Sequence, residues 1–268
     1  MNLYHSVAGK MEYIQKVFLG VQDFMQKKHE MEELIAFLDA EPSAFRSVAY
    51  ESASMEIGWQ EIAAGKELII WKTFYQRSAK AHTFHMDIGL GWAYAKSDIS
   101  PAPYLKSLPS VMSPMVFDGM GYYYGLFKIR KTVKNQLIPA GINEQELNGF
   151  DQGLGRRLWY MAKGDVTELH QLLQPFHQSR KADLWRGIGI ACGYVGGCDN
   201  KKLEQLLNAS AEYTTPFSTG ISLAAISRSA SNSITEDIEL ACEIICRKPL
   251  KDVLPMEIAQ INQIKSNS

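Results

Sequence analysis

The sequence has no long hydrophobic run and no excess of charge of either sign. Its apolar stretches fall short of the roughly 18 residues that a membrane-spanning helix needs, so we expect no membrane span. Residues 1–10 show no basic-then-apolar signal pattern, which predicts a cytoplasmic location. The 28 Lys and Arg residues balance 29 Asp and Glu residues, and this balance argues against nucleic acid or an anionic membrane surface as a partner.

Cysteine is also scarce, and the four cysteines form two pairs close in sequence. Cys192 lies near Cys198, and Cys242 near Cys246. Four thiolates are enough for a zinc ion, but we interpret these residues as small buried thiols in a reducing compartment. His82 and His85 have a spacing that suits two metal ligands on one helix face, but no further ligand completes the set. We predict no metal site.

Two motifs of cofactor and hydrolase chemistry are missing. The glycines at 187–197 lack the spacing and the preceding strand of a dinucleotide-binding loop, so we predict no cofactor. Small residues at such spacing are more typical of two helices that approach closely. No G-x-S-x-G motif is present, so a Ser/His/Asp triad has no support.

What the sequence does contain is helical periodicity along most of its length. From Ile14 to Met25 apolar residues recur every three or four positions, and similar stripes follow to the C-terminus. Ser43 and Ser113 are candidate N-caps, and Asp165 follows Gly164 where one helix ends and the next begins. No stretch alternates with a period of two. The predicted fold class is all-α.

An internal repeat with an offset of 99 to 101 residues is the most informative structural feature. Glu51 matches Asp151, Gly89 matches Gly189, and Gly119 matches Gly220. The chain therefore predicts two pseudo-symmetric repeats of about 100 residues, packed face to face around a pseudo-twofold axis as one globular unit. The seam between two such repeats is a place where a cavity can form.

These features predict a single helical domain over residues 1–268. Its predicted segments are N-terminal helices at 11–40, repeat one at 43–130, repeat two at 145–232 and C-terminal helices at 235–264.

Several long motifs carry a resemblance to a known family. They are HMDIGLGWA at 85–93, FDGMGY at 117–122, FDQGLGRRLW at 150–159 and DLWRGIG at 183–189. In these motifs the chain resembles the uncharacterised, UnbL-like protein family encoded in enediyne antibiotic gene clusters. The first repeat departs from the pattern at 51–54 (ESAS), where glycine would follow the acid. The resemblance implies a role in assembling a polyene-derived secondary metabolite, and it supplies no catalytic mechanism.

Recurring acids are the candidate catalytic residues. Glu51 and Asp151 occupy matching positions, and Asp87 and Asp118 lie near glycines in apolar surroundings. A carboxyl group desolvated near a second carboxyl has a raised pKa and can act as a general acid. The alternative is structural, with each acid paired to a nearby arginine or capping a helix.

The candidate substrate-binding residues are cationic or aromatic. Arginines can hold a carboxylate, a phosphate or a pantetheine arm through bidentate contacts. Aromatic rings can line a tunnel for a conjugated hydrocarbon, and the alternative role for these aromatic residues is packing in the core. The candidates are Arg156, Arg186, Trp92, Tyr122, Trp159 and Trp185.

Two functions remain open at this point. In the first, the protein binds a hydrophobic polyketide intermediate and assists its cyclisation or a proton transfer. In the second, it is a non-catalytic helical scaffold or chaperone for a polyketide synthase partner or a reactive product. The predicted partners are the hydrophobic intermediate, with a polyketide synthase, a carrier protein and a second copy of the chain as further candidates.

Overall fold

The computed structural model describes residues 6–27, 29–108 and 111–254. These residues form helices and loops and contain no strand, which confirms the all-α prediction. The chain divides into two compact parts. Of the described residues, those between 12 and 154 form the first part, and residues 6–11 together with 155–254 form the second.

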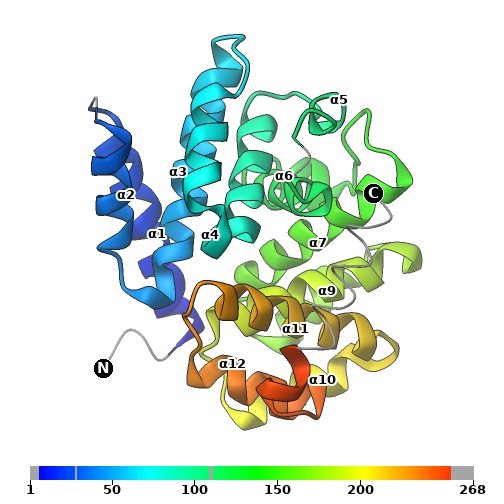
Figure 1. Cartoon of the computed structure of the whole chain (residues 1–268). Helices are drawn as coiled ribbons and strands as arrows, with labels where there is room; N and C mark the ends of the chain where they lie inside the picture. The colour runs from blue at the N-terminus through cyan, green and yellow to red at the C-terminus, as the bar shows by residue number, and fades with distance from the viewer. Residues whose placement is uncertain (1–5, 28, 109–110, 255–268) are drawn as a thin grey trace. The chain divides into compact units, whose positions relative to one another are not determined.

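The helices of the first part follow the predicted periodicity closely. They are α1 (Val7–Met25), α2 (Met31–Asp39), α3 (Ser43–Ala63), α4 (Ile69–Lys96), α5 (Ala102–Leu105), α6 (Ser113–Phe127), the π-helix η2 (Arg130–Lys134) and α7 (Glu144–Met161). The boundary between the parts falls inside α1 and inside α7. Figure 1 shows α3 and α4 side by side, as their extensive contacts require.

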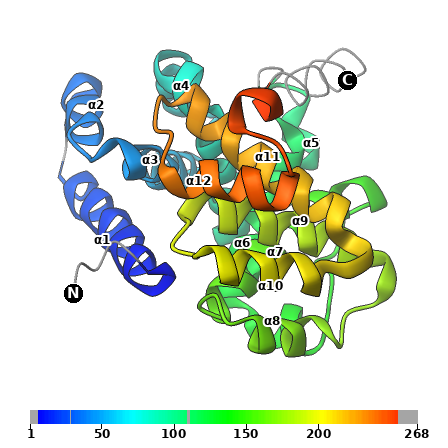
Figure 2. The same cartoon turned by 90° about the horizontal axis from the view of Figure 1, so that it is seen from below.

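The second part consists of shorter helices around α9 and α11. They are α8 (Val166–Leu173), α9 (Gln178–Val195), α10 (Asn200–Ser210), the 3-10 helix η3 (Ala211–Tyr213), α11 (Thr214–Ala230), α12 (Glu236–Ala241) and the π-helix η4 (Cys242–Cys246). Figure 2 shows α9 beside α11, with α12 next to them. Of the C-terminal helices predicted at 235–264, residues 255–264 lie outside the described part of the chain.

Three helix starts differ from the predicted positions, and one agrees. α1 begins at Val7, four residues before the predicted start of the N-terminal helices. Ser43 and Ser113 are the first helical residues, and the N-cap positions belong to Pro42 and Met112. Asp165 is the N-cap of α8 as predicted, since its carboxylate accepts a hydrogen bond from the backbone of Glu168 at 2.8 Å.

The crossing of α4 and α6 in the first part is so close that only glycine fits. A Cβ atom on Gly91 would lie 1.9 Å from the carbonyl oxygen of Val116, and one on Gly119 would lie 2.0 Å from that of Ile88. Each helix thus contributes a glycine at the point where the other's backbone approaches. The missing side chains are what allow the two backbones to touch.

The crossing of α9 and α11 in the second part has the same construction. A Cβ atom on Gly189 would lie 2.2 Å from the carbonyl oxygen of Phe217, and one on Gly220 would lie 2.0 Å from that of Arg186. The prediction that glycines at 187–197 let two helices approach closely is therefore confirmed at Gly189. Close glycine contacts of this kind also occur at Gly89, Gly121, Gly153 and Gly155.

We predict that Gly153→Ala lowers the free energy of unfolding by about 3 kcal/mol or more. The added Cβ would lie 1.7 Å from the carbonyl oxygen of Asp118, so α6 and α7 would have to separate. Gly20→Ala is the matched control, because Gly20 also lies within a helix but has no atom within 4 Å of its added Cβ. It should be neutral or stabilise by up to about 1 kcal/mol. Denaturant unfolding of both variants checks this, and equal stabilities would contradict the close crossing.

Candidate functional site

The four predicted acids all lie in the first part, on four helices, and all are buried. Glu51 is 4% exposed, Asp151 is 1% exposed, and Asp87 and Asp118 are fully buried. Buried carboxylates need hydrogen-bond partners or opposite charges, so their surroundings decide what each can do.

Glu51 pairs with a histidine and not with an arginine. Its carboxylate lies 2.7 Å from Nδ1 of His85 on α4, and the His85 side chain is also buried. Gly89, one turn after His85, brings α4 so close to α3 that its added Cβ would lie 2.2 Å from the carbonyl oxygen of Glu51. The resulting acid–imidazole pair is shielded from water and has the geometry of a proton-transfer dyad.

Asp87 and Asp118 have structural partners. The Asp87 carboxylate accepts a hydrogen bond from the backbone of Met112 at 2.9 Å, so it caps the start of α6 from a different helix. Burial, with the Asp87 charge and hydrogen bond adding to it, raises the pKa of Tyr75. Asp118 accepts a hydrogen bond from Nε2 of Gln152 at 2.8 Å. The Asp87 contact matches the helix-cap alternative, whereas the hydrogen bond of Asp118 with Gln152 is neither an arginine pair nor a helix cap.

Trp92 and Tyr122 are brought together in an aromatic cluster of the first part. The Trp92 ring centroid lies 5.2 Å from that of Tyr122, 5.4 Å from Phe18 and 5.8 Å from Tyr123. The cluster also includes Phe127, whose ring lies 4.7 Å from that of Tyr123. Trp92 is buried, whereas Phe18, Tyr122 and Tyr123 are half-buried and Phe127 is 59% exposed.

The remaining candidates belong to the second part. Arg186 forms an ion pair with Asp183 at 2.6 Å, three residues earlier on α9. Trp159 is fully buried, and Trp185 packs edge-on against Phe217 with ring centroids 5.5 Å apart. Both tryptophans therefore pack in the core. Arg156 is also buried.

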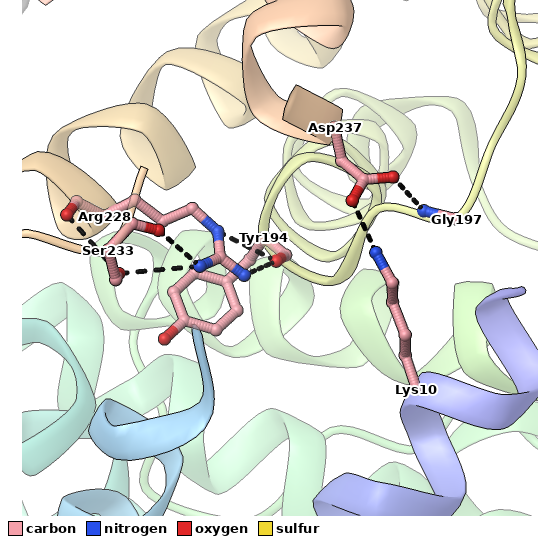
Figure 3. A network of polar contacts seen from close by, with 6 residues as sticks. All are labelled: Lys10, Tyr194, Gly197, Arg228, Ser233 and Asp237. Carbon is pink, nitrogen blue, oxygen red and sulfur yellow. Dashed lines mark hydrogen bonds and ion pairs between the residues drawn. The ribbon is translucent and has the colours of Figure 1, made fainter. Parts of the chain in front are cut away.

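A polar network holds the end of α9 in the second part (Figure 3). Arg228 is 3% exposed, and its guanidinium donates to the carbonyl oxygens of Tyr194 and Ser233 while lying 4.2 Å above the Tyr194 ring. Asp237 accepts a hydrogen bond from the backbone of Gly197 at 2.7 Å and pairs with Lys10. Because these groups satisfy helix-end and turn backbone, their role is structural.

The two cysteine pairs are close in space as well as in sequence. A hydrogen bond from the neighbouring thiol lowers the pKa of Cys198, while the same contact together with burial raises that of Cys192. The corresponding contact with Cys246 raises the pKa of Cys242. Within the described residues, no three His, Cys, Asp or Glu side chains are grouped so as to hold a metal ion.

His82 completes a buried polar layer beside the Glu51–His85 pair. Its Nδ1 lies 2.9 Å from Oγ of Ser47, and its ring stacks on Tyr50 at 4.0 Å. At this residue α4 departs from helical torsion angles (φ −125°, ψ 17°). Burial, reinforced by the neighbouring His85, lowers the pKa of His82 to about 4. The sequence marked His82 and His85 as a pair, but each contacts a different residue of α3.

The lowered pKa of His82 predicts a loss of stability in acid. Its folded-state pKa of about 4 lies below the ordinary value of 6.5, so the unfolded chain takes up a proton first. The free energy of unfolding should fall between about pH 6.5 and about pH 4, by on the order of 3 kcal/mol. In His82→Asn, whose amide oxygen can take the place of Nδ1, this share of the pH dependence should disappear. His170→Asn, at an exposed site, is the control. Identical pH profiles for His82→Asn and wild type would rule out this assignment.

Comparisons with known proteins give a family and no function. No curated protein and no solved structure matches the chain. Within the described residues, no helix has the length and apolarity to cross a membrane. A family profile described as "Protein of unknown function (DUF1702)" matches residues 4–265. Since this match spans nearly the whole sequence, the chain belongs to the DUF1702 family.

Proposed function

We propose that this protein binds a hydrophobic, conjugated small molecule against the aromatic cluster around Trp92. In this proposal it is an accessory protein in the biosynthesis of a polyene-derived secondary metabolite, of the enediyne kind or another. The biosynthetic context rests on the resemblance of motifs such as residues 150–159 to the enediyne-cluster family. The ligand class rests on the cluster itself, and that observation carries the proposal.

The cluster combines a buried anchor with accessible rings. Trp92 and three other members of its hydrophobic core, Met55, Ile88 and Met115, are buried, while the tyrosines and Phe18 pack against it from the half-exposed side. Aromatic faces and polarizable methionine side chains bind flat conjugated chains through dispersion and offset stacking. Ligand sites are commonly lined in this way, with few polar groups.

The Glu51–His85 pair supplies the polar chemistry near this cluster. His85 and Trp92 are seven residues apart on α4, which is about two helical turns or roughly 10 Å along the axis. Ile88 lies between them on α4, and Met55 follows Glu51 by one turn on α3, so these two members of the cluster are the ones that come next to the dyad along their helices. Proton transfer needs hydrogen-bond distance, so we propose that a long ligand held at the cluster extends along α4 to the dyad, which moves a proton to or from that end of the ligand.

The second candidate function is a non-catalytic scaffold for a polyketide synthase partner or a reactive product. One observation favours it: Ile69 and Ile70, at the start of α4, are 64% and 53% exposed. Adjacent exposed isoleucines are the kind of feature that partner proteins cover. In this function the buried acids serve folding alone.

We also propose that the chain arose by duplication, with α3, α4 and α6 corresponding to α7, α9 and α11. The support is the likeness of the two reciprocal glycine crossings. Gly91 faces α6 as Gly189 faces α11, and Gly119 faces α4 as Gly220 faces α9. These contacts pair α4 with α9 at an offset of 98 residues and α6 with α11 at 101.

This register changes which residues are equivalent. The hydroxyl of Ser54 on α3 contacts the carbonyl oxygen of Met86 on α4, and Gly155 on α7 faces the carbonyl oxygen of Leu184 on α9. Met86 and Leu184 are equivalent at the offset of 98 residues, so Ser54 and Gly155 are equivalent too, and α3 corresponds to α7 at an offset of 101 residues. The counterpart of Glu51 is then Gln152, and not Asp151. The Glu51–His85 pair has no acid–histidine equivalent in the second repeat, so we place the proposed chemistry in the first.

Ligand binding is tested with a fluorescent conjugated tetraene fatty acid titrated into the full-length protein. Trp92→Leu should weaken its binding at least about tenfold, because an aromatic contact and its buried area are both lost. Trp59→Leu is the control, since Trp59 packs against Lys96 outside the cluster, and it should keep wild-type affinity. Equal affinities in the two variants would remove the cluster from the proposal.

The role of the acids is tested with shape-preserving variants in the producing organism. Glu51→Gln should keep the free energy of unfolding within about 2 kcal/mol of wild type yet abolish formation of the metabolite. Asp151→Asn tests the acid that the sequence repeat, though not the register of the glycine crossings, matches to Glu51. If the acids are only structural, product titre should fall no further than protein abundance does. A stable and fully productive Glu51→Gln variant would exclude the dyad from the chemistry.

A further inference from the structure

The net charge of the chain is close to zero, but one segment is strongly basic. Residues 119–143 contain no Asp or Glu, and their four cations lie within seven positions, at Lys128, Arg130, Lys131 and Lys134. The cations directly follow the end of α6 at Phe127, in a stretch that appears in green in Figure 1. The net charge of the whole sequence is −1, and this sum does not reveal the local charge of +4 on residues 119–143.

The backbone holds this segment so that three of its four cations are exposed. Thr132 and Val133 are the buried residues of η2, and the Thr132 hydroxyl donates to the carbonyl oxygen of Tyr124 at 3.1 Å. The backbone of Leu137 bonds to the carbonyl oxygen of Lys131 at 2.9 Å. The segment is therefore tied to α6 and to itself. Arg130, Lys131 and Lys134 are all exposed.

Large apolar side chains flank these cations and are exposed beside them. Phe127 is 59% exposed at the end of α6, and Leu137 and Ile138 are 54% and 43% exposed after the π-helix. We call residues 127–138 the basic–apolar surface. Exposed apolar side chains that lie close together commonly mark an interaction site. The combination is typical of segments that lie in the headgroup region of a bilayer, where cations meet phosphates and apolar side chains enter the acyl boundary.

We propose that the basic–apolar surface binds peripherally to a lipid surface that carries anionic headgroups. An acidic protein would also attract the four cations, but three of them are lysines, and lysine is depleted at protein–protein interfaces. Lysine is well suited to headgroup phosphates, which it meets as a point charge with a flexible stem. Phe127, Leu137 and Ile138 gain free energy by leaving water, and a bilayer places an apolar phase directly beside the phosphates.

The position of Phe127 connects this surface with the aromatic cluster. Its ring lies 4.7 Å from that of Tyr123 and 6.2 Å from that of Trp92. The cluster thus reaches the molecular surface beside the cations. A hydrophobic ligand dissolved in a bilayer would meet the aromatic rings there without crossing water. This last step rests on the proposed function, whereas lipid binding by the basic–apolar surface does not.

The test is co-sedimentation of the full-length protein with vesicles. Binding should be strong for phosphatidylcholine mixed with phosphatidylglycerol and weak for phosphatidylcholine alone. It should fall as the ionic strength rises from about 0.1 M to about 1 M, since the Debye length shrinks from about 10 Å to about 3 Å. Equal binding to the two vesicle types, or none to either, would overturn the proposal, as would capture of an acidic protein without vesicle binding.

Matched charge variants locate the binding surface. Each cation near an anionic bilayer contributes roughly fivefold to partitioning, so the triple variant Arg130→Gln, Lys131→Gln, Lys134→Gln should bind about a hundredfold more weakly. The control triple Lys66→Gln, Lys80→Gln, Lys201→Gln removes equal charge from exposed sites elsewhere and should bind like wild type. Similar losses in both triples would contradict the assignment. Melting curves check that both are folded.

A third variant separates the apolar contribution from the charge and from the ligand site. Leu137→Ser with Ile138→Ser should weaken vesicle binding roughly tenfold while keeping its salt dependence. Neither this variant nor the basic triple should change the affinity for the conjugated fatty acid in vesicle-free solution. Failure of the lipid proposal and failure of the ligand proposal therefore give different results. Unchanged vesicle binding in this variant would overturn the assignment of the apolar side chains.

Discussion

The close helix crossings made by glycine set the spacing on which the other features of each part depend. Where Gly91 meets α6 or Gly220 meets α9, two helix backbones touch, and no side chain can be inserted between them. At such crossings the neighbouring side chains of both helices are forced into direct contact and lose their water. Burial of polar groups under these conditions is tolerated only when partners are fixed in place. The crossing of α3 with α4 fixes such partners at Glu51 and His85.

One close crossing thus serves two chemically different neighbourhoods along α4. Around Gly89, small side chains of α3 leave room for a dry acid–imidazole pair and for the Ser47–His82 contact. Two turns after His85, the same helix presents Trp92 to a partly open set of aromatic rings. A fixed helix pair therefore holds a polar dyad and an apolar platform at a constant separation. Enzymes and binding proteins place reactive groups on rigid elements for this reason.

The sequence predicts the helices well because their apolar residues repeat every three or four positions, a local property. It predicts cap positions less well, because Asp87 caps the start of α6 from another helix and makes a capping role for Ser113 unnecessary. The burial of Glu51 could be predicted from its apolar surroundings, but its pairing with His85 could not. That contact joins residues 34 positions apart, and it depends on how two helices rotate against each other. The basic–apolar surface was missed because the charges were summed over the whole chain.

The central claim is that the glycine-set spacing of α3 and α4 positions the Glu51–His85 pair. The most direct measurement is the nitrogen chemical shift of the His85 ring by nuclear magnetic resonance in wild type, Gly89→Ala and Gly20→Ala. A methyl group on Gly89 would lie 2.2 Å from the carbonyl oxygen of Glu51 and must push the helices apart. We predict lower stability and a shifted His85 Nδ1 signal in Gly89→Ala alone. A Gly89→Ala variant with wild-type stability and an unchanged His85 signal would contradict the account.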